Sequence, residues 1–210
     1  MANKVKYGLS NVHYAIVTET ETDGVKSSTY GPVKSWPGAV SLNMDPSADK
    51  QVFRADNSDY FVTYGDGSYE GELACALIPE DIKKEILGYQ LDDNGILVES
   101  SASFSTDKYF AMMWEFEGDK KKKKHCFYKV SLGRPSISSE TTGENGQIDV
   151  QTETAPLTAV PRVDEDKYIH VETGDTTSQE AYDAWYTNVP IPTFTNPAPK
   201  NPNTENQNPQ

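Results

Sequence analysis

The sequence contains no apolar run of about eighteen residues, the length that indicates a membrane-spanning helix. Its first residues, MANKVKYGLS, also lack the apolar segment of a secretory signal, so we expect a cytosolic product. Cysteine is nearly absent, since Cys75 and Cys126 are the only two in 210 residues. Both fall on apolar strand faces, and disulfides are rare in cytosolic proteins, so we expect two buried free thiols.

Recognisable catalytic and metal-binding motifs are also missing. The sequence has no G-x-S-x-G elbow, no phosphate-cradling glycine loop and no H-E-x-x-H. His13, His125 and His170 show no metal-ligand spacing with one another or with the cysteines, so we expect ordinary strand residues and no metal. The segment 92–95 (DDNG) resembles part of a calcium loop, but no carboxylate stands at the first or twelfth ligand position, and a turn is favoured. We therefore expect no enzymatic activity.

Positive charge is scarce, with 19 Lys and Arg against 32 Asp and Glu and a net charge of −13. Such a surface repels phosphates, which excludes sequence-reading nucleic-acid binding but not a protein past which DNA slides. The exception is the run Lys120 to Lys124, at the expected tip of a hairpin spanning 108–132. It is either a solvated turn that blocks edge pairing, or a basic tip that docks on an acidic patch of a neighbouring copy.

What the sequence does contain is many short alternating segments separated by turn residues, which predicts one β-rich domain. The expected strands are 12–19, 38–44, 51–55, 59–64, 69–77, 96–99, the two arms of the 108–132 hairpin, 147–157 and 168–171. A second helix is expected from Thr177 to Tyr186. Residues 190–210 are rich in Pro and Asn and are expected to form a disordered tail, leaving a domain of residues 1–189.

The chain is organised around 59–100, for which we expect a hairpin, a short helix and a return to strand. The turn GDGS at 65–68 is typical of a tight hairpin that joins 59–64 to 69–77. Alternation places Leu73, Cys75 and Leu77 on one face and Glu70 and Glu72 on the other. The first face is expected to pack on the helix, which leaves an acidic sheet face exposed.

The short helix that covers this apolar face has recognisable ends. Pro79 suits its first turn, and Gly88 suits its termination. Ile82, Ile86 and Leu87 form its apolar stripe. In the later hairpin, strict alternation places one set of apolar residues on a common face: Phe110, Met112, Trp114, Phe116, Cys126, Tyr128, Val130 and Leu132.

Four segments resemble the major tail tube proteins of long, flexible-tailed bacteriophages. They are VHYAIVTE, GAVSLNMDPSADKQVFRADNSDYF, GELACALIPEDIKKEILGYQLDDNGILVES and DKYFAMMWEFEG with its lysine-rich tip, and the likeness covers 5–189. The resemblance implies a tail-tube-like fold, mainly β: a β-sandwich or half-barrel with one flanking α-helix and a short C-terminal helix. It implies hexameric rings stacked into a tube that conducts the genome during ejection, with no enzymatic activity and no cofactor. The implied partners are other copies of the chain, the tape-measure protein, the tail terminator, the distal tip proteins and phage DNA in transit without sequence-specific binding. The implied location is the virion tail, assembled in the host cytoplasm.

Two sets of candidate site residues follow. Carboxylates on polar strand faces would repel DNA from a bore, and the lumen-lining candidates are Glu70, Glu72, Asp149 and Glu153. In the resembling family an early loop and the chain ends cross between subunits, and the loop corresponds here to 42–57, expected to be mobile in the monomer and ordered in the tube. The candidates for contacts between subunits and rings are Asp45, Asp49, Lys50, Arg54, Lys120, Lys121, Lys122, Lys123 and Lys124.

Two other functions remain open at this point. One is another phage tail morphogenesis protein on the same architecture, such as a tail terminator or a sheath-like component. The other is a carbohydrate-binding β-sandwich, suggested by twelve tyrosines and three tryptophans. The second would need exposed aromatic rings, whereas Trp114 and Trp185 are expected in the core.

Overall fold

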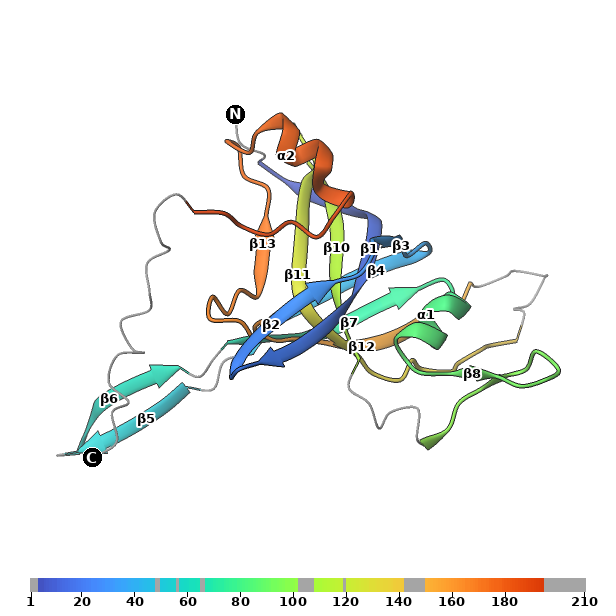
Figure 1. The fold of residues 1–210 in the computed structure, drawn as a ribbon, viewed down its shortest axis with the longest axis horizontal. Coiled ribbons are helices and arrows are strands. Elements are labelled where there is room, and N and C mark those ends of the chain that lie inside the picture. Colours follow the sequence, from blue (N-terminus) through green and yellow to red (C-terminus); the bar gives the residue numbers. More distant parts are fainter. Residues whose placement is uncertain are drawn as a thin grey trace.

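The fold is mainly antiparallel β, as the sequence predicts, and most of its strands belong to one curved sheet (Figure 1). The computed structural model describes residues 4–47, 50–55, 57–64, 67–101, 108–118, 120–141 and 150–194. The strands are β1 (Lys6–Thr22), β2 (Val25–Tyr30), β3 (Lys34–Ser35), β4 (Ala39–Ser47), β5 (Lys50–Ala55), β6 (Ser58–Tyr64), β7 (Ser68–Cys75), β8 (Gln90–Leu91), β9 (Leu97–Val98), β10 (Tyr109–Gly118), β11 (Lys123–Leu132), β12 (Glu153–Ala159) and β13 (His170–Glu172). The helices are α1 (Glu80–Glu85), α2 (Gln179–Asp183) and the 3-10 turn η3 (Ala184–Tyr186). None of the helices in these ranges is long and apolar enough to cross a membrane.

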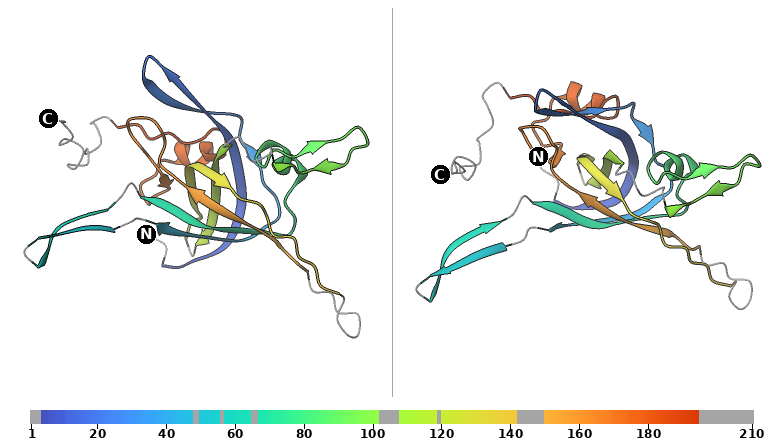
Figure 2. Two further views of the ribbon diagram at one scale, coloured as in Figure 1. Left: turned by 90° about the horizontal axis from the view of Figure 1, so that it is seen from below. Right: turned by 60° about the horizontal axis from the view of Figure 1, so that its bottom comes forward.

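The main sheet has the order β2-β1-β10-β11-β12-β7-β4, and its curvature makes a half-barrel (Figure 2). Two strands pair with the edge of β11 that faces away from β10: β12 with its C-terminal part and β13 with its N-terminal part. The concave side encloses the main core, to which β1, β7 and β10 contribute Tyr14, Leu73 and Phe110. Trp36, which lies between β3 and β4, is also buried in this core.

Helix α1 packs against the main core, as its apolar stripe predicts. Ile82, Ile86 and Leu87 are all buried in the main core. Pro79 precedes the first turn, and Gly88 has the positive φ, +74°, that favours glycine just beyond a helix end. The expectation for Leu77 is wrong: β7 ends at Cys75, and Leu77 is 64% exposed.

The convex side of β1, β10 and β11 carries a second hydrophobic core, which simple alternation along the strands does not predict. Alternation predicts Cys126 and Tyr128 on the same face as Trp114. The pairing, however, goes from Phe110 opposite Val130 to Met112 opposite Phe127, so β11 contains one extra residue and its alternation shifts. The second core contains Ala15, Val17, Ala111, Met113, Cys126, Tyr128, Trp185 and Val189.

The C-terminal segment covers this second core. Ser178 caps helix α2, since its side chain accepts a hydrogen bond from the Ala181 backbone N–H, and η3 then places Trp185 against the sheet. The Tyr128 hydroxyl donates to the Pro190 carbonyl oxygen over 2.6 Å, so the chain contacts the domain just beyond the expected boundary at 189. Residues 195–210, the rest of the expected tail, lie outside the described part of the chain. Both cysteines are buried and free, as predicted.

The hairpin expected between 59–64 and 69–77 is wrong. β6 pairs with β5, and β7 pairs with β4 on one side and β12 on the other. The register continues from Ser47 opposite Ser68 to Lys50 opposite Tyr64, so β5 and β6 form a two-stranded ribbon inserted between β4 and β7. Its turn includes Asn57 at φ +60°. The ribbon projects away from the half-barrel in every view (Figures 1 and 2).

Strand β12 begins later than the sequence predicts, at Glu153 rather than at 147, and Glu153 has a structural contact. It pairs with Cys75 and therefore lies on the concave side of the sheet. Its Oε2 accepts a hydrogen bond from the Ile78 backbone N–H over 2.7 Å, and its Oε1 lies 3.1 Å from Nζ of Lys83 on α1. Glu153 thus fastens the start of α1 to the sheet.

Replacing Glu153 by alanine is therefore expected to lower the free energy of unfolding by about 1–3 kcal/mol, because the Ile78 N–H loses its acceptor. The matched variant Lys83→Met removes only a partly solvated ion pair and should cost about 1 kcal/mol or less. Chemical denaturation of both variants measures the difference. Equal losses would contradict this role for the Ile78 hydrogen bond.

Candidate functional sites

An acidic face lies on the outside of β4 and β7, away from the main core. Asp45 is directly opposite Glu70, and Asn43 is directly opposite Glu72. Asp45, Glu70 and Glu72 are exposed. On β12 the same face continues with Pro156 and Thr158, which are both uncharged. Like charges directly opposite each other destabilise a sheet, so the Asp45–Glu70 pair is not explained by folding.

The structure separates the four lumen-lining candidates. Glu70 and Glu72 share the acidic face, whereas Glu153 lies on the opposite side of the sheet with Lys83. The three residues therefore cannot line the same face. In the β7–β12 pairing, Glu153 is opposite Cys75, whose side chain points to the side of the sheet opposite to Glu70 and Glu72. Asp149 lies outside the described residues. Asp45, chosen from the sequence as an inter-subunit candidate, belongs to the same face as Glu70.

The early-loop candidates fall at the base and on the side of the projecting ribbon. Lys50 and Arg54 lie on β5. Asp49 lies outside the described residues. The described parts of 42–57 are strands β4 and β5 and the turn residue Asn57 rather than a loop, and the expected ordering on assembly stays a prediction.

The lysine-rich tip is largely bound to its own subunit. Lys122 Nζ lies 2.8 Å from carboxylates of both Glu115 and Glu117, and these hydrogen bonds raise the pKa of Lys122. Lys123 forms an ion pair with Glu172 at 2.8 Å. The charges of Lys122 and Lys123 are thus compensated within the subunit, which weakens their attraction for an acidic patch on a neighbouring copy. Docking of the lysine run on such a copy stays a prediction.

Two other lysines of the run hold α2. Lys124 is buried and donates to the Tyr182 carbonyl oxygen over 2.8 Å, and burial lowers its pKa. Lys121 Nζ lies 3.7 Å from the centre of the Tyr182 ring. The Tyr182 hydroxyl in turn donates to the Lys122 carbonyl oxygen. The tip therefore fixes the helix that covers the second core.

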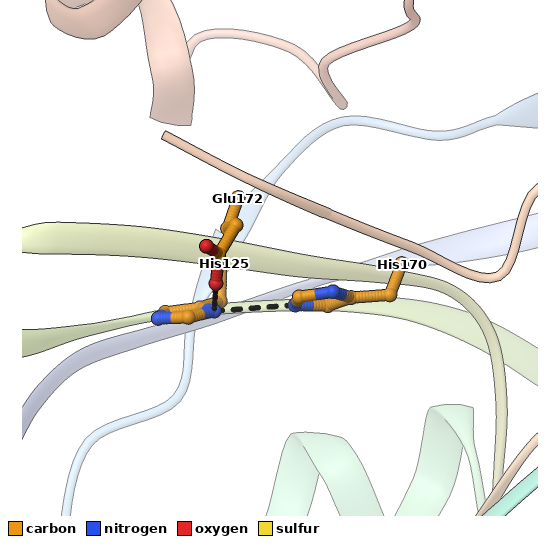
Figure 3. Close-up of side chains that lie close together, drawn as sticks. All are labelled: His125, His170 and Glu172. Atoms are coloured by element: carbon orange, nitrogen blue, oxygen red, sulfur yellow. Dashed lines mark hydrogen bonds and ion pairs between the residues drawn. The ribbon is translucent and has the colours of Figure 1, made fainter. Parts of the chain in front are cut away.

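A histidine–glutamate cluster joins β11 to β13, where the sequence spacing gave no reason to expect one (Figure 3). Glu172 is directly opposite His125, and His170 lies two residues before Glu172 on the same face of β13. His125 Nδ1 lies 3.2 Å from His170 Nε2 and 3.4 Å from Glu172 Oε2. The spacing His-x-Glu in an expected strand predicts one shared face, but the position of His125 depends on a long-range strand pairing.

The surroundings keep the His125 ring neutral and fixed. The ring stacks on Trp114 with centroids 5.3 Å apart and planes 10° apart, and the edge of Phe116 approaches it. Burial lowers the pKa of His125 to about 4, and burial also lowers the pKa of His170. Burial alone would raise the pKa of Glu172, but the hydrogen bond from Lys123 holds it below its usual value. At neutral pH the cluster therefore offers two imidazole nitrogens and one carboxylate.

Comparisons with known proteins identify no family. No protein-family model matches the chain, and no curated protein matches it either. Among solved structures, the chain is similar to a chain in the cryo-EM structure of the anti-feeding prophage (AFP) baseplate, 6-fold symmetrised, with a TM-score of 0.35 and 6% sequence identity over 80% of this chain and 96% of that one. Similarity at this level assigns neither a fold nor a role.

Proposed function

We propose that this chain is a structural subunit of a bacteriophage tail, which forms hexameric rings that stack into the tail tube. The observation that carries the proposal is the pair of open sheet edges. β2 and β4 end the main sheet, and the described part of the chain supplies neither with a partner on its outer side. Open strand edges are templates for pairing with other chains. Contacts between two different edges of identical copies close into a ring when the rotation between copies allows it.

The sequence resemblance to tail tube proteins supplies the geometry of this assembly. Pairing of end strands around a ring would join the sheets of all copies into one continuous barrel, and closure removes every open edge. The projecting β5–β6 ribbon, which carries Lys50 and Arg54, is suited to reach the next ring of the stack. The tape-measure protein, the tail terminator and the distal tip proteins are the expected partners, and the virion tail is the location, with assembly in the host cytoplasm.

The acidic face of β4 and β7 is assigned to the bore. Carboxylates at Asp45, Glu70 and Glu72 would repel DNA phosphates, at about 1 kcal/mol per contact pair in bulk water and more at lower dielectric. DNA would then pass without being held and without sequence-specific contacts. The role needs no enzymatic activity and no cofactor.

A carbohydrate-binding function receives little support. Sugar rings stack on exposed aromatic side chains, but all three tryptophans, Trp36, Trp114 and Trp185, are at most 5% exposed. A tail terminator or a sheath-like component remains the nearest alternative, because it would share the architecture.

Electron microscopy of the purified full chain, combined with sedimentation over a range of protein and salt concentrations, tests the proposal. We expect long tubes of regular rings. Isolated rings that never stack would favour a tail terminator. A chain that stays monomeric under all conditions would contradict the proposed function.

A further inference from the structure

We propose that His125, His170 and Glu172 form a binding site for a divalent transition-metal ion, Zn²⁺ by its donor set, which fastens β13 to β11. The donor atoms of the three residues all lie within 4.8 Å of one another. Two of the separations are 3.2 Å, between the ring nitrogens, and 3.4 Å, between His125 Nδ1 and Glu172 Oε2. A tetrahedral zinc ion with bonds of about 2.0–2.1 Å holds its ligand atoms roughly 3.3–3.4 Å apart. Two of the three separations therefore already match those of a zinc coordination shell.

The chemistry of the donors selects the class of ion. Two imidazoles and one carboxylate are a common zinc ligand set, with water completing the fourth position. Ca²⁺ and Mg²⁺ prefer oxygen ligands and are disfavoured by two nitrogens. Thiolates do not take part, since Cys126 points into the second core and Cys75 into the main core.

Neighbouring groups hold the donors in place. Lys123 binds Glu172 through Oε1 at 2.8 Å. The other carboxylate oxygen, Oε2, faces His125 (Figure 3). The Trp114 ring fixes the plane of His125. Such supporting contacts orient metal ligands. Lys123 also places a positive charge near the ion, so the affinity should be lower than that of thiolate-rich structural sites.

Without a metal, one proton between the two ring nitrogens explains their 3.2 Å contact. In that arrangement the nitrogens point at each other, and metal binding requires the rings to rotate until both lone pairs aim at one point. A proton-bridged histidine pair is therefore the competing account, and the experiment must separate the two.

A metal at this position would act on the C-terminal segment. β13 has only three residues and leads to α2 and η3, which cover the second core. A cross-link between β11 and β13 would stabilise this cover, because a ligand that binds only the folded state raises its stability. The site lies within one subunit, so it does not depend on ring formation.

The test uses the full chain without an affinity tag, treated with EDTA and titrated with Zn²⁺ by calorimetry and with Co²⁺ by visible spectroscopy. We expect one ion per chain, a tetrahedral Co²⁺ spectrum displaced by Zn²⁺, and a thermal midpoint raised by roughly 5–10 °C at a 100-fold excess over Kd. His170→Gln and Glu172→Gln should each weaken binding at least about tenfold.

The matched control is His13→Gln, since His13 is the third histidine of the chain and bonds the Asn11 carbonyl oxygen on β1. It should bind Zn²⁺ like the wild type, and circular dichroism checks that every variant folds. The proposal would be overturned if the wild type bound no Zn²⁺, or if binding survived both His170→Gln and Glu172→Gln. The contact between the two rings would then be a proton-bridged histidine pair and not a metal site. Assembly into tubes can succeed or fail independently of either result.

Discussion

Replacing Gly71 by alanine is expected to lower the free energy of unfolding by at least about 3 kcal/mol, because the new methyl group would collide with backbone. A Cβ at Gly71 would lie 1.9 Å from the Asn43 carbonyl oxygen and 2.9 Å from Met44 Cα. Neither atom can rotate away, so β4 and β7 would have to separate. Chemical denaturation of the purified variant measures the loss.

The same substitution should also impair assembly, because β4 is an end strand of the sheet and carries Asp45 of the acidic face. Gly67→Ala is the matched control, since a Cβ at Gly67 meets nothing within 4 Å. It should change stability by about 0.5 kcal/mol or less. A Gly71→Ala protein as stable as the control would show that the close approach of β4 and β7 is not as described.

Reversing the charge of the acidic face, with Glu70→Lys and Glu72→Lys together, should leave tubes that assemble but eject DNA slowly. Both side chains are exposed, so the fold should tolerate lysine there. Repulsion of phosphates becomes attraction at every subunit of the bore, and the contributions add along the tube. We expect ejection slower by roughly tenfold or more at low salt, with the delay reduced at high salt as the lysine–phosphate contacts are screened.

The control for this experiment is Glu140→Lys with Glu165→Lys, which changes the net charge equally at exposed positions outside β4, β7 and β12. Particles with this pair should eject at the wild-type rate. Ejection kinetics measured on both kinds of particle separate bore charge from total charge. Normal ejection by the Glu70→Lys, Glu72→Lys particles would remove the lumen assignment.

Local signals in the sequence were sufficient for α1 and for the start of α2. Pro79, the stripe of Ile82, Ile86 and Leu87, and Gly88 act within one short segment, and the structure confirms each of them. The mainly β class follows equally from short alternating segments. The acidic face of Glu70 and Glu72 could also be predicted, since alternation within β7 is undisturbed.

Long-range pairing explains what the sequence did not predict. The turn-like residues 65–68 suggested a local hairpin, but β7 pairs with β4 across the inserted ribbon. One extra residue in β11 moved Cys126 and Tyr128 to a second core, and no alternation pattern reveals such a bulge. The cluster of His125 and His170 likewise exists only because β13 pairs with β11.

A cryo-EM reconstruction of the assembled protein would show whether the sheet edges of neighbouring copies pair to build a tube. We expect a hollow tube in which β2 and β4 edges are paired between copies and Glu70 and Glu72 line the bore. A bore lined by lysine and arginine, or an assembly with the β4–β7 face turned outward, would contradict it.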